Sequence, residues 1–553
     1  MLLLVFAGLA TALLWRALDL QVLNEDFLQQ QGAARYLRVV EMPAHRGAIT
    51  DRHGQPLAIS SPVDSVWANP GELLASGESL APLARLLGLD AAALHRRLEQ
   101  RASREFVYIK RHITPELGEQ VQSLGLPGVA LQREYRRFYP AGEVAAHVVG
   151  FTNVDDIGQE GMELAYDDWL RGDPGAKRVV KDRLGRIIDD VESLREPKPG
   201  EALTLSIDRR LQYLAYRELK TAVTEHGARA AALVMLDAQT GEVLAMVNQP
   251  AYNPNNRAEI SGGRYRNRAV TDSFEPASTL KPFAVLAALE SGAYGPDSII
   301  NTSPGVMRVD GHTVRDPRDY GRIDVATVIE KSSNVGVARM ALNIEADAIW
   351  GLLLRLGLGA PTGTTFPGEA GGSISGMPPR SSIDRAALAY GYGVAVTPLQ
   401  LAQAYTVLAA DGIKRPVSFL KLDQAPVGER ILDAQSVRRV RGMMEAVVSD
   451  TGTASRAQIP GYRVAGKTGT AKKAVAGGYS DNRYVALFAG MAPASAPRLV
   501  LVVVVDEPVE DYYGGKVAAP IFAKVMGGAL RLLNVPPDDV SSLQHALATR
   551  RDA

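Results

Sequence analysis

The stretch that decides the fold runs from Ser278 to Leu289 and reads STLKPFAVLAAL. The apolar run after Lys281 predicts a buried helix that begins near Ser278. Residues i and i+3 of a helix share one face, so Ser278 Oγ and Lys281 Nζ can meet there. Serine becomes a nucleophile when a neighbouring base accepts its proton, and burial lowers the pKa of a lysine enough for it to be that base. The alternative is a helix cap with an ordinary surface lysine.

A second polar motif, Ser332-Ser333-Asn334, lies between two helix-like segments. Taken alone, a polar tripeptide between apolar helices is usually a turn. As part of a site, Ser332 can pass a proton between Lys281 and a leaving amine, and Asn334 can hold a substrate amide.

A third motif, Lys467-Thr468-Gly469-Thr470, predicts a strand whose glycine lets another backbone approach closely. Lys467 can place a second positive charge beside the first lysine and attract a carboxylate, which the hydroxyl groups of Thr468 and Thr470 can also bind. The backbone N–H groups of Ser278 and Thr470 are candidates for an oxyanion hole. Alone, this motif predicts an edge strand and a turn. The three motifs in this order favour a serine acyltransferase.

Length and composition exclude several other classes of function. A chain of 553 residues is too long for one core, so we expect two or more domains. A formal net charge of zero disfavours nucleic-acid binding. The absence of cysteine excludes disulfides and a thiol nucleophile, and the eight histidines lack metal-ligand spacing. No metal, nucleotide or other cofactor is implied.

The N-terminus carries an uncharged apolar run from Leu2 to Trp15. A spanning helix needs about 20 apolar residues, so the run is short. It also lacks the basic start and the cleavage site of a secretory signal. We expect residues 1–22 to be an uncleaved membrane anchor whose upstream part is missing from this reading frame. A signal-peptide core and a buried helix are the alternatives. A polar, mostly helical stalk is expected to follow, to about Glu41.

The rest of the chain divides at a charged segment rich in Pro and Gly, at residues 196–202. Before this linker, 23–195 is predicted to be a pedestal with amphipathic helices within 78–101 and 114–124. After it, 203–535 is the predicted catalytic domain, and 536–553 is a C-terminal tail. The catalytic domain is predicted to be an α/β sandwich whose sheet pairs distant segments. Its main predicted elements are a helix at 208–223, a hairpin at 231–237 and 242–247, strands at 484–489 and 499–505, and a final helix at 519–533.

With its three motifs, the chain resembles the class B penicillin-binding proteins, and among them the division-specific transpeptidases of the FtsI family. The resemblance covers nearly the whole chain. Its further motifs are Arg46–Arg52, Tyr139–Phe151, Gly158–Glu163, Gly391-Tyr392-Gly393, Thr397–Gln400 and Tyr512–Gly515, leading to Ala519-Pro520.

The resemblance implies a single-pass inner-membrane anchor, a mixed α+β pedestal and a periplasmic transpeptidase domain, with an antiparallel sheet sandwiched by helices. It makes Ser278 the acyl-ester nucleophile and Lys281 its base, and Ser332, Asn334 and Lys467–Thr470 complete the site. The implied substrate is the D-Ala-D-Ala end of a peptidoglycan stem pentapeptide, which β-lactams mimic. The implied partners are a polytopic division glycosyltransferase and other membrane proteins of the divisome at the septum.

One position departs from the family, because Ala277 stands where glycine usually precedes the serine. If that position needs a positive φ, alanine costs roughly 1 kcal/mol. Three other classes of protein fit the sequence less well. An elongation-type transpeptidase usually has Asp at the position of Asn334, and both Asn334 and Lys331 favour division. The large pedestal argues against a β-lactamase, a β-lactam sensor or a D,D-carboxypeptidase. The intact Ser278, Lys281 and Lys467 argue against a catalytically silent scaffold.

Overall fold

The computed structural model describes residues 1–18, 37–181, 187–256, 258, 262–475, 477–542 and 544. Helix α1 (Leu2–Leu18) covers the apolar N-terminal run. Within the described ranges, no helix has both the length and the apolar character that a membrane crossing requires. Most of the predicted stalk lies outside the described residues. Its last part forms strand β1 (Leu37–Met42), so the helical prediction is wrong there, because Val39 and Val40 favour a strand that pairs with a neighbour.

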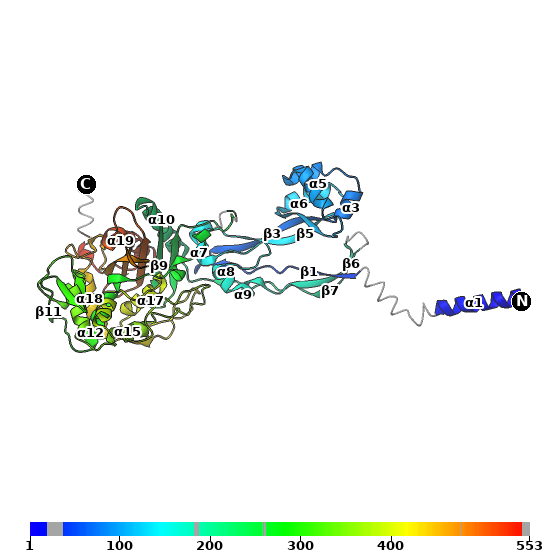
Figure 1. Cartoon of the computed structure of the whole chain (residues 1–553). Helices are drawn as coiled ribbons and strands as arrows, with labels where there is room; N and C mark the ends of the chain where they lie inside the picture. The colour runs from blue at the N-terminus through cyan, green and yellow to red at the C-terminus, as the bar shows by residue number, and fades with distance from the viewer. Residues whose placement is uncertain are drawn as a thin grey trace.

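The N-terminal region is elongated and two-armed, as Figure 1 shows. One arm has the strand order β4-β3-β2-β8, and β5 also pairs with β3. Its elements are β2 (Ile49–Thr50), β3 (Pro56–Ala68), β4 (Val107–Ile113), β5 (Val129–Phe138), β8 (Leu203–Thr204), α3 (Pro70–Ala75), α4 (Ala81–Leu87), α5 (Ala91–Glu99) and α6 (Pro115–Ser123). Leucines of these helices and residues of β3 and β4 form a core of their own. The helices predicted within 78–101 and 114–124 are confirmed.

The second arm is a three-stranded sheet of order β1-β6-β7, with β6 (Gly175–Lys181) and β7 (Ile187–Arg195). Short helices α7 (Ala146–Val149), α8 (Gly161–Ala165) and α9 (Asp167–Arg171) lie where the arms meet the C-terminal body. Buried ion pairs join the segments there. Glu163 lies 2.8 Å from Arg46 and 2.6 Å from Arg137, and Arg46 lies 2.7 Å from Asp167. This network contains Arg46 and Glu163 of the N-terminal motifs.

The C-terminal body is built on an antiparallel sheet of order β10-β9-β19-β18-β17. The strands are β9 (Ala230–Asp237), β10 (Val243–Gln249), β17 (Ala465–Val475), β18 (Gly478–Ala492) and β19 (Leu499–Asp506). Helices α10 (Arg209–Glu225) and α19 (Gly514–Leu532) pack on one face, and α11 (Arg268–Thr271) and α17 (Pro398–Ala409) pack on the other. The predicted hairpin and the sandwich that pairs distant segments are confirmed.

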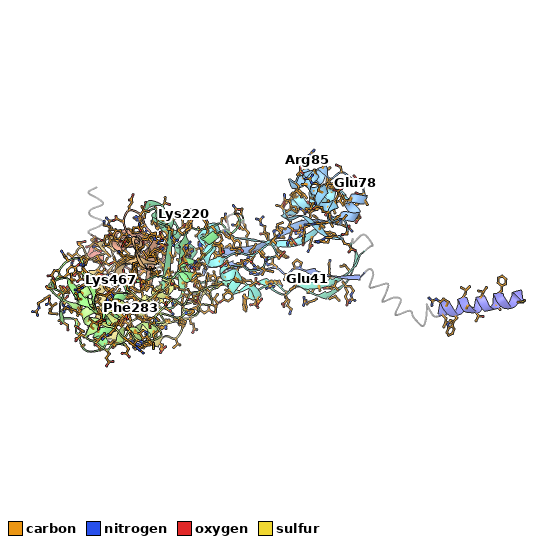
Figure 2. All side chains as sticks on the ribbon, viewed as in Figure 1. Glu41, Glu78, Arg85, Lys220, Phe283 and Lys467 are labelled. Carbon is orange, nitrogen blue, oxygen red and sulfur yellow. The ribbon has the colours of Figure 1, made fainter. Side chains whose placement is uncertain are left out.

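A helical subdomain lies beside β17 and completes the body. Its central helix, α12 (Lys281–Glu290), is buried along nearly its whole length, as its apolar sequence predicts. Figure 2 places Phe283 of this helix and Lys467 of β17 in the C-terminal body. The remaining elements are α13 (Val325–Glu330), α14 (Asn334–Leu342), α15 (Ala348–Leu356), α16 (Ser382–Ala389), α18 (Ala434–Ala446), β11 (Ile299–Asn301), β12 (Val306–Val309), β13 (His312–Arg315), β14 (Arg322–Asp324), β15 (Ile413–Lys414) and β16 (Glu429–Arg430).

Candidate active site

The predicted nucleophile lies in a tight turn that enters α12. Residues Ala277–Leu280 form one 3₁₀ turn, and Ala277 has a φ of +47°. The turn is held from outside, because the Ala277 N–H donates to the Gly391 carbonyl oxygen at 3.0 Å. A Cβ on Gly391 would lie 2.0 Å from the Ala277 oxygen, so the Gly391-Tyr392-Gly393 motif needs its first glycine. The partly exposed Ser278 is thereby fixed at the start of a buried helix.

Lys281 is completely buried one turn after Ser278. Its Nζ lies 2.7 Å from Asn334 Oδ1, 3.1 Å from Ser332 Oγ and 2.5 Å from the Ser332 carbonyl oxygen. Burial, and then the charge of Lys467, hold the pKa of Lys281 well below its ordinary value. Among the described residues, no hydrogen bond joins Lys281 to Ser278 Oγ. The amine is therefore protonated less readily than an ordinary lysine, as a general base requires.

The second motif forms a turn that a buried carboxylate organises. Asp316 accepts hydrogen bonds from the backbone N–H groups of Asn334 at 2.5 Å and Val335 at 3.0 Å, and from the hydroxyl of Ser333 at 2.5 Å. Ser333 in turn caps α14, and Ser332 has a φ of +58°. A negative charge at a helix N-terminus is favourable. Sequence reasoning missed Asp316, because a single aspartate in a loop carries no recognisable pattern.

The third motif lies on β17, at the edge of the sheet next to the nucleophile turn. Lys467 is fully buried and donates to Ser332 Oγ at 2.9 Å. Burial lowers the pKa of Lys467 to about 7, so its charge responds to neutral pH. A Cβ on Gly469 would lie 3.0 Å from the Pro276 oxygen, so this glycine allows the strand to approach the turn.

The threonines of the third motif are held by neighbouring segments. Thr468 Oγ1 is hydrogen-bonded to Thr453 Oγ1 at 3.0 Å. Thr470 Oγ1 accepts from the Gly514 N–H at 3.1 Å, which connects the motif to the segment Tyr512–Gly515. Thr453 was not predicted, and nothing in its local sequence distinguishes it from other loop threonines.

The structure thus brings the three motifs together. Lys281, Ser332, Asn334 and Lys467 form one hydrogen-bonded cluster. Ser278 begins the helix that carries Lys281, and Thr470 lies on the strand that packs against its turn. A serine at a helix start, a buried lysine one turn later and a second lysine on an adjacent edge strand define the penicillin-recognising serine enzymes as a class.

Comparison with known proteins agrees with this class. Residues 231–527 match the model of the penicillin-binding protein transpeptidase domain, and 41–205 match that of the penicillin-binding protein dimerisation domain. The chain is 44% identical to the peptidoglycan D,D-transpeptidase FtsI of Escherichia coli, over 96% of this chain and 91% of that protein. It is 42% identical to the probable peptidoglycan D,D-transpeptidase PbpC of Pseudomonas aeruginosa, over 97% and 95%.

Solved structures show the same architecture. Penicillin-binding protein 3 of Mycobacterium tuberculosis, in complex with aztreonam, superposes with a TM-score of 0.71 at 29% identity. The match covers 90% of this chain and 98% of that one. The chain belongs to the FtsI family of class B penicillin-binding proteins.

Proposed function

We propose that this chain is a septal peptidoglycan D,D-transpeptidase in which Ser278 forms an acyl-enzyme with the penultimate D-Ala of a stem pentapeptide. The observation that carries the proposal is the buried Lys281 amine, one turn after Ser278 and hydrogen-bonded to Ser332 and Asn334. The names of the relatives, which are peptidoglycan D,D-transpeptidases, support the reaction class.

In the acylation step, Ser278 Oγ bonds to the carbonyl carbon while its proton moves to Lys281 Nζ. The negative charge that develops on the carbonyl oxygen meets the backbone N–H groups of Ser278 and Thr470, and each such donor contributes about 3–4 kcal/mol. The bond to terminal D-Ala then breaks. Its amine leaves with a proton that Ser332 passes on from Lys281, which restores the base.

Substrate binding uses the charge and the free edge of β17. The carboxylate of terminal D-Ala is attracted by Lys467 and hydrogen-bonds with the hydroxyls of Thr468 and Thr470. A bound carboxylate raises the pKa of Lys467 from about 7 and so fixes its charge. An edge strand offers unpaired N–H and C=O groups, so the extended stem peptide adds to β17 as a further strand. Asn334 holds a substrate amide.

Deacylation completes the cross-link. The amine of a neighbouring stem peptide attacks the ester carbonyl and loses a proton to the site, and Ser278 Oγ regains one as it leaves. The products are the new amide and the free enzyme. A β-lactam acylates Ser278 in the same way, but its leaving group stays tethered to the acyl group, and the adduct hydrolyses slowly.

The proposal also assigns roles to the rest of the chain. Residues 1–22 anchor it in the inner membrane, which the apolar helix Leu2–Leu18 supports. The pedestal (23–195) and the linker (196–202) hold the transpeptidase domain (203–535) in the periplasm. Glycan strands must come from another enzyme, so the anchor and pedestal contact a polytopic glycosyltransferase and other membrane proteins of the divisome.

Labelling with a fluorescent penicillin tests the reaction. We expect a long-lived adduct, located on Ser278 by mass spectrometry of peptides and lost in Ser278→Ala. Ser273→Ala is the matched control, since this exposed serine lies in the same segment and should label normally. Labelling that survives in Ser278→Ala would refute the assignment. Absence of any adduct indicates a scaffold, and loss within seconds indicates a β-lactamase.

The cellular role needs its own test. Depletion of a septal enzyme stops division while elongation continues, so the cells of the host bacterium should become filaments. Cells that round up instead would indicate an elongation-type transpeptidase.

A further inference from the structure

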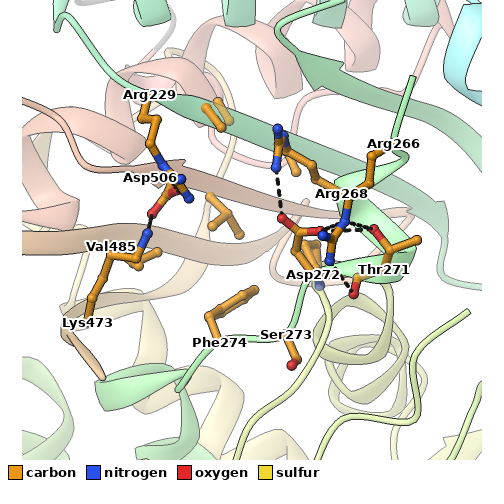
Figure 3. Close-up of a pocket in the computed structure, with 15 residues that line it drawn as sticks. Arg229, Arg266, Arg268, Thr271, Asp272, Ser273, Phe274, Lys473, Val485 and Asp506 are labelled. Atoms are coloured by element: carbon orange, nitrogen blue, oxygen red, sulfur yellow. Dashed lines mark hydrogen bonds and ion pairs between the residues drawn. The ribbon is translucent and has the colours of Figure 1, made fainter. Parts of the chain in front are cut away.

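A cavity lies at one end of the central sheet. It has a volume of about 280 Å³, and none of the four residues of the catalytic cluster lines it. Figure 3 shows its two sides: the ends of the strands with Arg229, Lys473 and Asp506, and the segment that carries Arg266 to Phe274. This second segment runs directly into the nucleophile turn.

The hollow follows from the sequence of β9. The strand begins with Ala230-Ala231-Ala232 and continues with the larger Leu233–Leu236. Small side chains leave space between the sheet and Phe274, which is only partly buried. Val485 of β18 and Val504 of β19 complete an apolar surface inside the cavity. A ligand can therefore bury apolar atoms there.

One wall is a neutral group of ion pairs. The register of β17 shifts between Lys472 and Ala474, and such a bulge turns one side chain away from the strand pattern. Lys473 Nζ reaches Asp506 at 2.8 Å and Glu507 at 2.6 Å. Arg229 also pairs with Asp506, at 2.8 Å. Two cations face two carboxylates, so this wall has no net charge.

The opposite wall has an excess positive charge. Arg266 Nε lies 2.5 Å from Asp272 Oδ1, and Arg268 lies 3.0 Å from Asp272 Oδ2. Two guanidinium groups thus share one carboxylate. Pro398, the first residue of α17, also lines the cavity, and the N-terminus of a helix adds positive partial charge. The wall is complementary to one negative charge.

We propose that this cavity binds a small organic carboxylate with an apolar body. The carboxylate meets Arg266 and Arg268, whose planar guanidinium groups suit bidentate pairing. The apolar part of the ligand packs against Phe274, Val485 and Val504. Such a ligand contacts the segment that leads to Ser278 and, through Lys473, the strand that carries Lys467. The site is separate from the catalytic cluster and does not depend on the proposed function.

Titration with para-fluorobenzoate, followed by fluorine NMR, tests the site in the full chain. The active site also attracts carboxylates, so the titration is run both on the free protein and after acylation with benzylpenicillin. We expect a dissociation constant of about 1–10 mM in both states, as a ligand of this size allows. Arg268→Gln and the more exposed Arg266→Gln should each weaken binding about tenfold. Arg217→Gln, an exposed ion-paired arginine on α10, is the matched control and should bind like the unaltered protein.

Three binding results would overturn the proposal, as would the displacement result given below: no binding by the free or the acylated protein, equal binding by both arginine variants and the control, or binding that acylation abolishes. A competition experiment tests whether the site prefers a ligand with an apolar part. Benzoate should displace the probe at lower concentration than inorganic phosphate, and equal displacement would mean that a simple anion site is present. Penicillin labelling is read separately, so failure here leaves the catalytic proposal unaffected.

Discussion

The alanine before the nucleophile gives a prediction whose sign distinguishes strain from ordinary helix propensity. Ala277 has a φ of +47°, in the left-handed region that costs a non-glycine residue about 1–2 kcal/mol. Ala277→Gly removes this cost. It also gives the unfolded chain more freedom, which destabilises the protein by about 0.4–1 kcal/mol. The difference predicts a net gain of about 0.5–1 kcal/mol in the free energy of unfolding.

The assay compares Ala277→Gly with Ala523→Gly, a matched change in the interior of α19 in the same domain. Glycine in a helix interior costs about 1 kcal/mol, so the control should unfold at a lower temperature. For a domain of this size, 1 kcal/mol shifts Tm by about 2 °C, so the two variants should move in opposite directions by about that much. Penicillin acylation should keep its rate, because the Ala277 N–H still donates to Gly391 and Phe274 still exchanges two backbone hydrogen bonds with Val396.

A fall in Tm of Ala277→Gly that matches the fall in Ala523→Gly would refute the reasoning, since the turn would then store no strain. An unchanged Tm of Ala277→Gly together with slower acylation would also contradict the reasoning. Alanine would then make the turn more rigid without destabilising the folded protein.

Four further predictions concern three residues of the candidate site and its surroundings. Asp316→Ala removes the shared acceptor of three hydrogen bonds, so we expect the free energy of unfolding to fall by about 2–5 kcal/mol in urea denaturation and penicillin labelling to slow. Under the proposed function, carboxylate binding needs protonated Lys467, so the second-order rate of acylation should fall as pH rises above about 7. Lys467→Arg should lose this dependence. In the unfolded chain Lys467 keeps its proton to about pH 10.4, whereas the folded protein releases it near pH 7. The contribution of Lys467 to the free energy of unfolding should therefore rise with pH between about 7 and 10, as thermal unfolding can measure. Gly391→Ala should give little folded protein, because its Cβ would lie 2.0 Å from the Ala277 oxygen and its φ is +84°.

The sequence predicts those parts of the fold in which one segment carries a strong signal of its own. The apolar run after Lys281 becomes the buried helix α12, and the apolar segment at 499–505 becomes β19. The prediction fails near Glu41, where pairing with β6 favours a strand over a polar helix. It also could not find Asp316, whose role depends on a loop folding back onto the second motif.

In the candidate site, too, the sequence predicts some residues, and others become evident only in the structure. Motif spacing singles out Ser278, Lys281 and Lys467, because the residue types and their spacing along the sequence already indicate this chemistry. The neighbouring residues that hold these side chains in place cannot be identified from the sequence in this way. The sequence identifies Gly391 as part of a motif, but the reason that glycine is needed there, a close approach to the Ala277 oxygen, exists only in the folded chain.

The acceptors around Lys281 explain why it does not contact Ser278. The amine donates to the oxygens that surround it. Asn334 donates its amide N–H to the Arg315 oxygen at 3.0 Å, so its Oδ1 faces Lys281 as an acceptor, and the Ser332 carbonyl is the second acceptor. The Ser332 hydroxyl oxygen is a third acceptor, 3.1 Å from the amine. That hydroxyl also accepts from Lys467. Three acceptors thus hold the amine away from Ser278. Under the proposed function, a substrate carboxylate that draws Lys467 away from Ser332 loosens this cluster and lets Lys281 turn toward Ser278.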